Sequence, residues 1–251
     1  MTYKATNFAR FCSRFIMPAY IKSELNNIEF SSTITFAKYQ NYYYAILAAH
    51  SVNGDINFIK RIGFFSIGGE FISLYSQSKY FIFDREKDII IFNTNIPIEN
   101  RWHFSLEEET GDFECRYASW IGFPQKKAIR QYHHTQSSPE HIKKAISTLA
   151  DGMPLINNAK FLSIDNRKVI SYGYDFIDIE FINKNVFYWQ EGHKTQGYSP
   201  RGMSGGAIFF RKPNIDVNGD CLLFPNPNVL IYLAGIGLSY EKNTIRGASR
   251  K

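Results

Sequence analysis

The residues Arg201-Gly202-Met203-Ser204-Gly205-Gly206-Ala207 are followed by the apolar run Ile208-Phe209-Phe210. A serine between glycines on a tight turn ahead of a strand is placed to act as a nucleophile, because the missing side chains let the backbone curl and let a substrate approach. In such a turn the N–H groups of Gly202 and Ser204 can point into one space that would hold an oxyanion. The same residues also suit a glycine-rich hairpin or β-bulge with an incidental serine. The rest of the chain must decide between these interpretations.

The composition around this stretch favours strands. The chain has 251 residues, enough for two small barrels in one compact unit. Aromatic residues make up 16% of it, with 22 Phe and 16 Tyr, and hydrophobic residues make up 44%. These residue types are enriched in strands and rare in disordered segments, so we expect a mainly β, folded chain.

The charge is spread along the chain. Its 29 basic and 23 acidic residues give a net charge of +6, with only short basic pairs such as Lys126-Lys127 and Lys143-Lys144. A nucleic-acid site would need a clustered basic patch, so nucleic-acid binding is the weakest of the functions considered, and we predict no nucleic-acid partner.

Cysteine usage and the start of the chain indicate a compartment. Cys12, Cys115 and Cys221 are too few and too far apart for a disulfide framework, and none has a metal-ligand spacing. The first residues lack the apolar core of a signal peptide, and no window approaches the ~18 apolar residues of a membrane span. We therefore predict a cytoplasmic protein with reduced thiols, no bound metal, no cofactor and no membrane partner.

Residues 1–27 are predicted to form an N-terminal extension with an amphipathic helix over residues 7–16. The apolar face of that helix consists of Phe8, Phe11, Cys12, Phe15 and Ile16. Arg10 and Arg14 lie opposite, and Pro18 ends the pattern. The helix suits docking on the body of its own chain better than binding to a membrane or partner, because ten residues give little surface for anchoring.

Residues 28–106 are predicted to form a first β-barrel of about six strands. The strand candidates are 28–39, 42–47, 58–67, 71–75, 79–83 and 88–93. Turns are expected at Gln40-Asn41, at Gly68-Gly69 and over residues 84–87.

Residues 107–251 are predicted to form a second barrel, after a polar linker at 107–112. Its strand candidates are 114–122, 160–164, 168–172, 176–182, 186–189, 207–211 and 229–233. Ser138 and Pro139 are typical of a helix start, so a helical insertion is expected near 138–151, with Ile142, Ala145, Ile146 and Leu149 on its apolar face. Residues 214–228 are expected to form a loop.

Four short motifs in this order resemble those of the chymotrypsin-like (trypsin-like, PA-clan) serine peptidases. They are Leu47-Ala48-Ala49-His50-Ser51-Val52, Asp88-Ile89-Ile90-Ile91-Phe92, Gly202-Met203-Ser204-Gly205-Gly206-Ala207 and Leu233-Ala234-Gly235-Ile236. The order His, Asp, Ser differs from that of the subtilisins and the α/β-hydrolases. The resemblance spans roughly residues 28–240, and it implies two six-stranded antiparallel β-barrels with a catalytic site between them.

The resemblance implies a catalytic role for three residues. Ser204 would be the nucleophile, His50 the general base, and Asp88 the acid that orients the imidazole. A buried structural histidine is the alternative for His50. His133 and His134 lie in a polar stretch and are interpreted as surface residues.

Asp84 is the rival for the role of Asp88. The charged neighbours of Asp84 are typical of an ordinary turn. Asp88, in contrast, stands at the start of an apolar run, where its carboxylate needs a partner. We therefore prefer Asp88.

The resemblance also implies substrate-binding positions. Tyr198 would stand at the floor of the pocket, beside Ser199, where an acid would select Arg or Lys. Leu238, Ser239 and Tyr240 would form the strand edge that pairs with the substrate backbone. Tyr240 replaces a small residue there and is expected to narrow the pocket.

Two departures from the family carry information. Ser51 stands where many secreted members have a cysteine, in agreement with a reducing compartment. Met203 stands where zymogen-type members have an aspartate that pairs with a new N-terminus, so maturation by that switch is not expected.

The sequence thus predicts a trypsin-like serine endopeptidase that hydrolyses peptide bonds of a protein or peptide substrate through an acyl-enzyme on Ser204. The alternative is a catalytically silent trypsin-like fold that acts as a protein-binding module. A regulatory protein partner is compatible with either hypothesis.

Overall fold

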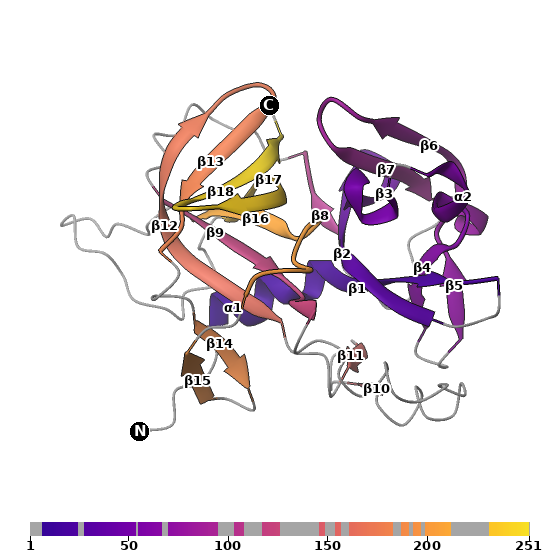
Figure 1. The fold of residues 1–251 in the computed structure, drawn as a ribbon, viewed down its shortest axis with the longest axis horizontal. Coiled ribbons are helices and arrows are strands. Elements are labelled where there is room, and N and C mark those ends of the chain that lie inside the picture. Colours follow the sequence, from indigo (N-terminus) through magenta and orange to yellow (C-terminus); the bar gives the residue numbers. More distant parts are fainter. Residues whose placement is uncertain are drawn as a thin grey trace.

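The computed structural model describes residues 7–24, 28–53, 55–66, 70–94, 103–107, 117–125, 146–148, 154–156, 161–182, 187–190, 193–196, 199–211 and 231–250. It is mainly β, with two curved sheets side by side (Figure 1). The sheet built from the first part of the chain is indigo to purple, and the sheet built from the later part is magenta to yellow.

The first sheet is curled but not closed. Its strands are β1 (Ile16–Lys22), β2 (Ile28–Tyr39), β3 (Tyr42–Ala48), β4 (Ile62–Phe65), β5 (Phe71–Ser73), β6 (Ser78–Asp84) and β7 (Ile89–Thr94). They are ordered β5-β4-β1-β2-β3-β7-β6, and β8 (Phe104–Ser105) adds a parallel pairing to β2. Among the described residues, the end strands β5 and β6 do not pair with each other. The prediction of a closed first barrel is therefore corrected to a half-barrel of seven strands along this path.

The second sheet is a closed six-stranded barrel. Its strands are β9 (Tyr117–Gly122), β12 (Leu162–Tyr172), β13 (Phe176–Glu180), β16 (Ala207–Arg211), β17 (Ile231–Glu241) and β18 (Thr244–Ser249). The order is β13-β18-β17-β16-β9-β12, and a pairing between β12 and β13 closes the ring. The hairpin of β14 (Phe187–Gln190) and β15 (His193–Gln196) extends from β12.

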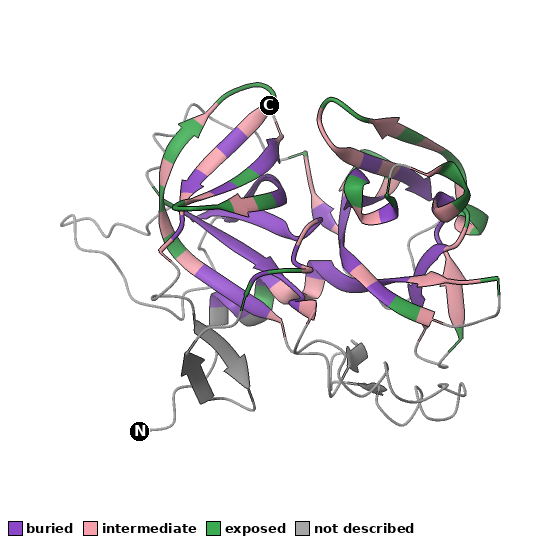
Figure 2. Ribbon diagram, in the orientation of Figure 1, coloured by how far each residue is buried: buried purple, intermediate pink, exposed green. Residues whose placement is uncertain are grey.

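Each sheet encloses an apolar core, and a third cluster joins the two. Figure 2 shows buried positions concentrated on β1 to β3 and on the strands of the closed barrel. The joining cluster takes residues from both ends of the chain, including Phe8 and Phe15 before the first sheet and Phe209 and Leu233 in the second. Phe15 packs against Phe104 and Phe209, with ring centroids 5.2 and 6.2 Å apart.

The N-terminal helix docks on its own chain, but it is shorter than predicted. It consists of α1 (Asn7–Cys12) and a single 3-10 turn, η1 (Ser13–Phe15). Phe8, Cys12 and Phe15 are buried, whereas Phe11 is partly exposed. Cys12 is a free thiol, and its burial raises its pKa well above the ordinary value. Cys115 and Cys221 lie outside the described residues.

The first sheet begins at Ile16, not at residue 28 as predicted. β1 runs between β2 and β4 and is buried at five of its seven positions, so it lacks the alternation that identifies a half-buried strand. Pro18 pairs only with β2, because β4 reaches no further along β1 than Tyr20. The missing N–H of Pro18 therefore costs no hydrogen bond to β4.

Other boundaries also differ from the predictions. Residues 56–59 form a helical turn, α2 (Ile56–Ile59), because Asp55 caps it by accepting from the N–H of Asn57 at 2.8 Å. Within the expected helix near 138–151, Ile146–Thr148 is strand β10, paired with β11 (Pro154–Ile156). β-Branched residues at 146 and 148 suit that pairing. The start of the expected helix, His133, His134 and the expected loop at 214–228 lie outside the described residues.

The mainly β architecture is compatible with the chymotrypsin-like fold that the resemblance implies, with one closed barrel and one half-barrel. In the described part of the chain, no helix has the length and apolarity needed to cross a membrane.

Candidate active site

His50 lies at the end of β3, on the edge of the cleft between the two sheets. The strand ends at Ala48, and the 3-10 turn η2 (Ala49–Val52) carries the histidine. Ala48 and Ala49 are buried, so the turn sits close against the sheet. The Ser51 hydroxyl donates to the carbonyl of Ala48 at 2.5 Å and fixes the turn. About half of the imidazole side chain, 49%, is exposed.

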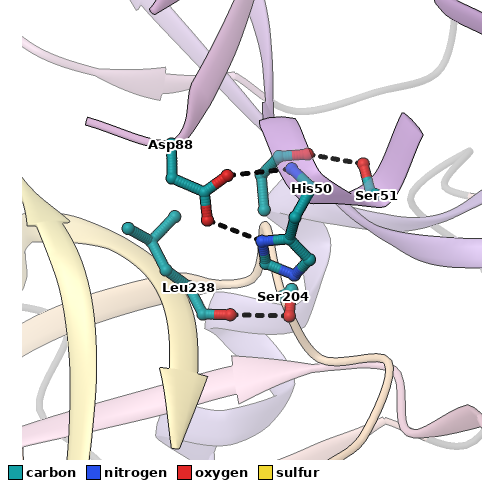
Figure 3. A network of polar contacts seen from close by, with 6 residues as sticks. His50, Ser51, Asp88, Ser204 and Leu238 are labelled. Carbon is teal, nitrogen blue, oxygen red and sulfur yellow. Dashed lines mark hydrogen bonds and ion pairs between the residues drawn. The ribbon is translucent and has the colours of Figure 1, made fainter. Parts of the chain in front are cut away.

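Asp88 is joined to His50 and its turn by three contacts, and Figure 3 shows the two that its carboxylate makes. One carboxylate oxygen, Oδ2, lies 2.6 Å from Nδ1 of the imidazole. The other, Oδ1, accepts from the backbone N–H of His50 at 2.8 Å. The backbone carbonyl of Asp88 accepts from the N–H of Ala49, also at 2.8 Å. These contacts fix the orientation of the imidazole through its Nδ1 edge.

The turn between β6 and β7 explains how Asp88 reaches this position. Asp88 has a positive φ of 54°, a conformation that Asp adopts more readily than most residues. Asp84 closes β6 instead, and its Oδ1 accepts from the N–H of Lys87 at 2.9 Å. The structure therefore brings Asp88, and not Asp84, to the histidine.

Ser204 lies on the turn before β16, below the free edge of the imidazole (Figure 3). Its hydroxyl donates to the carbonyl of Leu238 on β17 at 2.7 Å. Three residues predicted from sequence, His50, Asp88 and Ser204, thus come together, although the serine hydroxyl is directed at Leu238 and not at the imidazole.

The N–H groups of Gly202 and Ser204 are aligned by the carbonyls on the other side of their peptide bonds. The carbonyl of Arg201 accepts from the N–H of Gln125 at 2.7 Å, and that of Met203 accepts from Gly206 at 2.8 Å. Since C=O and N–H point in opposite directions in a trans peptide, these bonds fix where the next N–H points. Among the described residues, neither the N–H of Gly202 nor that of Ser204 has a protein acceptor.

Two glycines make this turn geometrically possible. Gly202 and Gly205 have φ values of +95° and +86°, which residues with a side chain rarely adopt. A Cβ on Gly205 would also lie 2.0 Å from the backbone oxygen of Thr33. Met203, between them, is fully buried in the core of the closed barrel, so packing anchors the turn from below.

Two threonines of β2 hold the same turn from the first sheet. Thr33 donates to this turn twice, through its N–H to the carbonyl of Ser204 at 2.8 Å and through its hydroxyl to that of Gly202 at 3.3 Å. The hydroxyl of Thr35 donates to the carbonyl of Gly205 at 2.7 Å. Both threonines are fully buried. Sequence reasoning missed them, because threonine is common in strands for its shape alone and no pattern in the sequence marks these two hydroxyls.

A cleft of about 570 Å³ surrounds Ser204 and His50. One part of its lining belongs to the second sheet and the turn before it, with Pro200, Arg201, Leu238, Ser239 and Tyr240. The other part belongs to the first sheet, with Ile21, Glu29, Phe30, Ser31, Ser32, Asn53 and Phe58. A chain lying in the cleft would therefore contact both halves of the molecule.

The predicted substrate-binding positions are placed as follows. Leu238, Ser239 and Tyr240 lie in β17 beyond Ile236, the last residue of this strand that pairs with β16, so one edge of the segment faces the cleft. The hydroxyl of Tyr240 is 2.6 Å from that of Ser199 and bridges β17 and the turn. Tyr198 lies outside the described residues.

No protein-family model matches the sequence, and no curated protein matches it.

Proposed function

We propose that this protein is a trypsin-like serine endopeptidase that uses Ser204, His50 and Asp88. The observation that carries the proposal is the joint geometry of the site. A carboxylate holds one edge of an imidazole, a serine lies below the other edge, and the N–H groups of Gly202 and of that serine have no protein acceptor among the described residues. A turn with only a structural role has no need for all three features at once.

In the proposed reaction, the Ser204 hydroxyl leaves the carbonyl of Leu238 when substrate enters and rotates toward the imidazole. Catalytic hydrogen bonds are often unformed before substrate binds, so the present orientation of the hydroxyl is compatible with this step. His50 accepts the hydroxyl proton as the serine oxygen attacks the substrate carbonyl. His50 then returns that proton to the leaving amine, and the acyl group remains on Ser204.

Asp88 and the turn divide the remaining work. Asp88 keeps the proton of the neutral imidazole on Nδ1, which leaves Nε2 free to act as the base. The N–H groups of Gly202 and Ser204 receive the negative charge that develops on the carbonyl oxygen. Water then enters, gives a proton to His50 and attacks the acyl carbonyl, which releases the acid and restores Ser204.

The direct test is labelling of the purified protein with a fluorophosphonate, which reacts with activated serines. We expect stoichiometric labelling on Ser204, identified by peptide mapping, and none in Ser204→Ala or His50→Ala. Ser171→Ala is the control, because that serine is exposed on the second barrel. The loss of peptidase activity should be about equal in the two site variants, since nucleophile and base act as one unit.

A folded protein that does not label at Ser204 would contradict this proposal and favour the binding-module alternative. Robust peptide hydrolysis by a folded Ser204→Ala variant would also overturn the assignment of the nucleophile.

A further inference from the structure

A second pocket, of about 340 Å³, lies in the first sheet and is lined by three cationic side chains, Lys22, Lys60 and Arg61. The rest of its lining is Ser23, Phe71, Ser73 and Ser76, so none of the described residues that line it is acidic. The chain carries a net charge of only +6 over 251 residues, and three cations at one pocket are therefore a local concentration of charge. We refer to this site as the basic pocket.

The fold brings these cations together at one end of three neighbouring strands. Lys22 ends β1, Arg61 precedes β4, and Ser73 ends β5, which pairs with β4. The N–H of Lys22 donates to the carbonyl of Arg61 at 3.1 Å, and the hydroxyl of Ser73 donates to the carbonyl of Lys60 at 2.9 Å. The backbones that carry the three cations are thus tied to one another.

The side chains indicate what the basic pocket would bind. The hydroxyls of Ser73 and Ser76 donate to backbone carbonyls, so the lysine ammonium groups and the guanidinium are its cationic donors. Arg61 already contacts one carboxylate, that of Glu24, whose side chain is 79% exposed. A contact to such an exposed carboxylate is worth little, so an incoming anion can replace it. The complementary ligand is an anionic side chain, either a carboxylate or a phosphate.

The basic pocket continues the active-site cleft on the side of the first sheet. Ile21 lines the cleft and the next residue, Lys22, lines the basic pocket. Phe58 lines the cleft, and Lys60 and Arg61 follow it after one residue. Two separate elements therefore connect the two sites. Successive side chains of a strand point to opposite faces, so the cleft and the basic pocket lie on opposite faces of β1. Because Ile21 and Lys22 are the last residues of β1, a peptide would pass from one site to the other around the end of this strand.

The direction of the proposed reaction assigns this side to the leaving group. The acyl part of a substrate would lie along the cleft-facing edge of Leu238–Tyr240 in the second sheet. The leaving amine receives its proton from His50 and departs over the first sheet, toward Ile21 and Phe58. We propose that the basic pocket binds an anionic side chain in the part of a polypeptide substrate that follows the scissile bond, separated from that bond by several residues. This inference rests on the proposed function.

The first test is a binding measurement that needs no catalysis. Fluorescein-labelled hexapeptides of otherwise uncharged sequence carry Glu, phosphoserine or Gln at one position, scanned from the first to the sixth residue. Their anisotropy is titrated with folded Ser204→Ala protein. At one or more positions beyond the second, we expect the Glu or phosphoserine peptide to bind about tenfold more tightly than the Gln peptide, because it forms two ion pairs near the protein surface. The difference should shrink at high salt.

The matched variants are Lys22→Gln with Lys60→Gln, and Lys168→Gln as a control for the loss of a lysine on the second barrel. The advantage of the anionic peptide should disappear in the double variant and persist in the control. The proposal would be overturned if the double variant preferred the anionic peptide over the Gln peptide as strongly as the protein with both lysines does. So would tight, Lys22- and Lys60-dependent binding of a single-stranded oligonucleotide with no preference among the peptides.

The second test uses the active protein and separates this inference from the proposed function. The ratio of kcat/KM for the Glu peptide to that for the Gln peptide should fall about tenfold in the double variant. If Ser204 labels and peptides are cleaved but the ratio does not change, the basic pocket is not a substrate site. If Ser204 never labels, the proposed function fails, and the anisotropy series alone decides whether the basic pocket binds anionic peptides.

Discussion

Asp88 does more in this structure than pair with an imidazole. Its Oδ1 accepts a hydrogen bond from the N–H of His50, and its backbone carbonyl accepts one from the N–H of Ala49. Asp88 therefore also fixes the turn that carries the histidine. Removing the Asp88 side chain would therefore disturb the position of His50 as well as remove the carboxylate beside it. A substitution that keeps the shape of Asp88 is needed to isolate the chemical role.

Asp88→Asn provides that substitution, and Asn tolerates the positive φ at this position. If the amide oxygen accepts from the N–H of His50, the amide nitrogen faces Nδ1 of the imidazole and donates to it. That hydrogen bond favours the tautomer with its proton on Nε2, which cannot act as the base toward Ser204. We expect peptide turnover to fall by about 10⁴-fold with little change in Tm.

Asp84→Asn is the matched control for this measurement. Its side chain accepts only from the turn at Lys87 among the described residues, so turnover should change little. If Asp84→Asn were the more damaging of the two changes, Asp88 would not be the residue that orients His50.

How far the site could be predicted depends on what each residue type signals by itself. His50 and Ser204 stand in short motifs with small neighbours. Asp88 stands directly before an apolar run, where a carboxylate close to the core needs a partner. The sequence was therefore sufficient to select these three positions, whose catalytic roles stay predictions. Thr33 and Thr35 could not be selected, because threonine is common in strands for its shape alone. Only the fold shows that their hydroxyls meet the serine turn.

At the scale of elements, β2 connects the first sheet to the serine turn of the second. Its alternating residues Thr33 and Thr35 donate to three carbonyls of that turn, those of Gly202, Ser204 and Gly205. The turn is thus held on one side by the core beneath Met203 and on the other by a strand from the opposite sheet. A change at Thr33 or Thr35, which do not line the cleft, should therefore affect reactivity at Ser204 without altering a contact to the substrate.

Thr33→Val tests this connection. Valine keeps the shape but removes the hydroxyl, which donates to the carbonyl of Gly202 and accepts from the N–H of Phe123 at 2.9 Å. Each buried group left without a partner costs about 1–3 kcal/mol. We expect slower fluorophosphonate labelling and a lower kcat, with a smaller change in KM because Thr33 does not line the cleft.

Thr33→Ser serves as the rescue variant, since it restores the hydroxyl. Labelling should return toward the wild-type rate in Thr33→Ser even if some packing is lost. Equal labelling rates in all three proteins would show that β2 does not position the turn.

A second prediction at this scale concerns the closed barrel. Asp178 on β13 and Arg246 on β18 are cross-strand partners, joined by two hydrogen bonds of 2.8 and 3.0 Å. The bond from Arg246 lowers the pKa of Asp178 below its ordinary value of 3.8. A lowered carboxyl pKa stabilises the folded state above pH 3.8, and this contribution is lost as the pH falls through the lower folded pKa.

Asp178→Asn should therefore lower Tm at neutral pH and reduce the fall in Tm at acidic pH. The effect should be modest, because the side chain of Arg246 is 55% exposed. Parallel Tm curves against pH for the two proteins would contradict the prediction.

The strands themselves were predictable where burial follows a simple pattern. β2 has the predicted bounds, Ile28 to Tyr39, because a long run of β-branched and aromatic residues ends at a polar turn. β1 was missed, because a strand buried on both faces shows no alternation and its Pro18 was interpreted as the end of the preceding helix. β18 was missed because Thr244–Ser249 contains a glycine, which is uncommon in strands. Closure of the first sheet was not predictable, since it depends on whether two distant end strands meet.

At the scale of the whole molecule, the two sheets share a core to which the N-terminal helix contributes. Phe15 packs against Phe104, which precedes the second sheet, and against Phe209 within it. Phe104 and Phe209 also contact each other, at 5.4 Å between ring centroids. The relative position of the sheets, and with it the distance from His50 to Ser204, depends on this cluster.

Phe15→Ala should destabilise the protein by about 3–5 kcal/mol, because it leaves a cavity between the sheets. Phe11→Ala is the control, since Phe11 is 36% exposed on the same short helix. Thermal unfolding monitored by circular dichroism should show a large fall in Tm for Phe15→Ala and a small one for Phe11→Ala. Similar Tm values for the two variants would mean that the helix is a dispensable attachment.

The shared core also has a consequence for how the chain acquires its structure. Phe8 and Phe15 are translated roughly two hundred residues before their partners Phe209 and Leu233. The first sheet cannot complete its packing before the second barrel has been synthesised, and the apolar helix stays without its final partners until that barrel forms. Such long-range contacts slow folding and prolong the exposure of apolar surface. Synthesis of the second barrel, and not completion of the first sheet, would then be the event that allows the His50 and Ser204 regions to assemble.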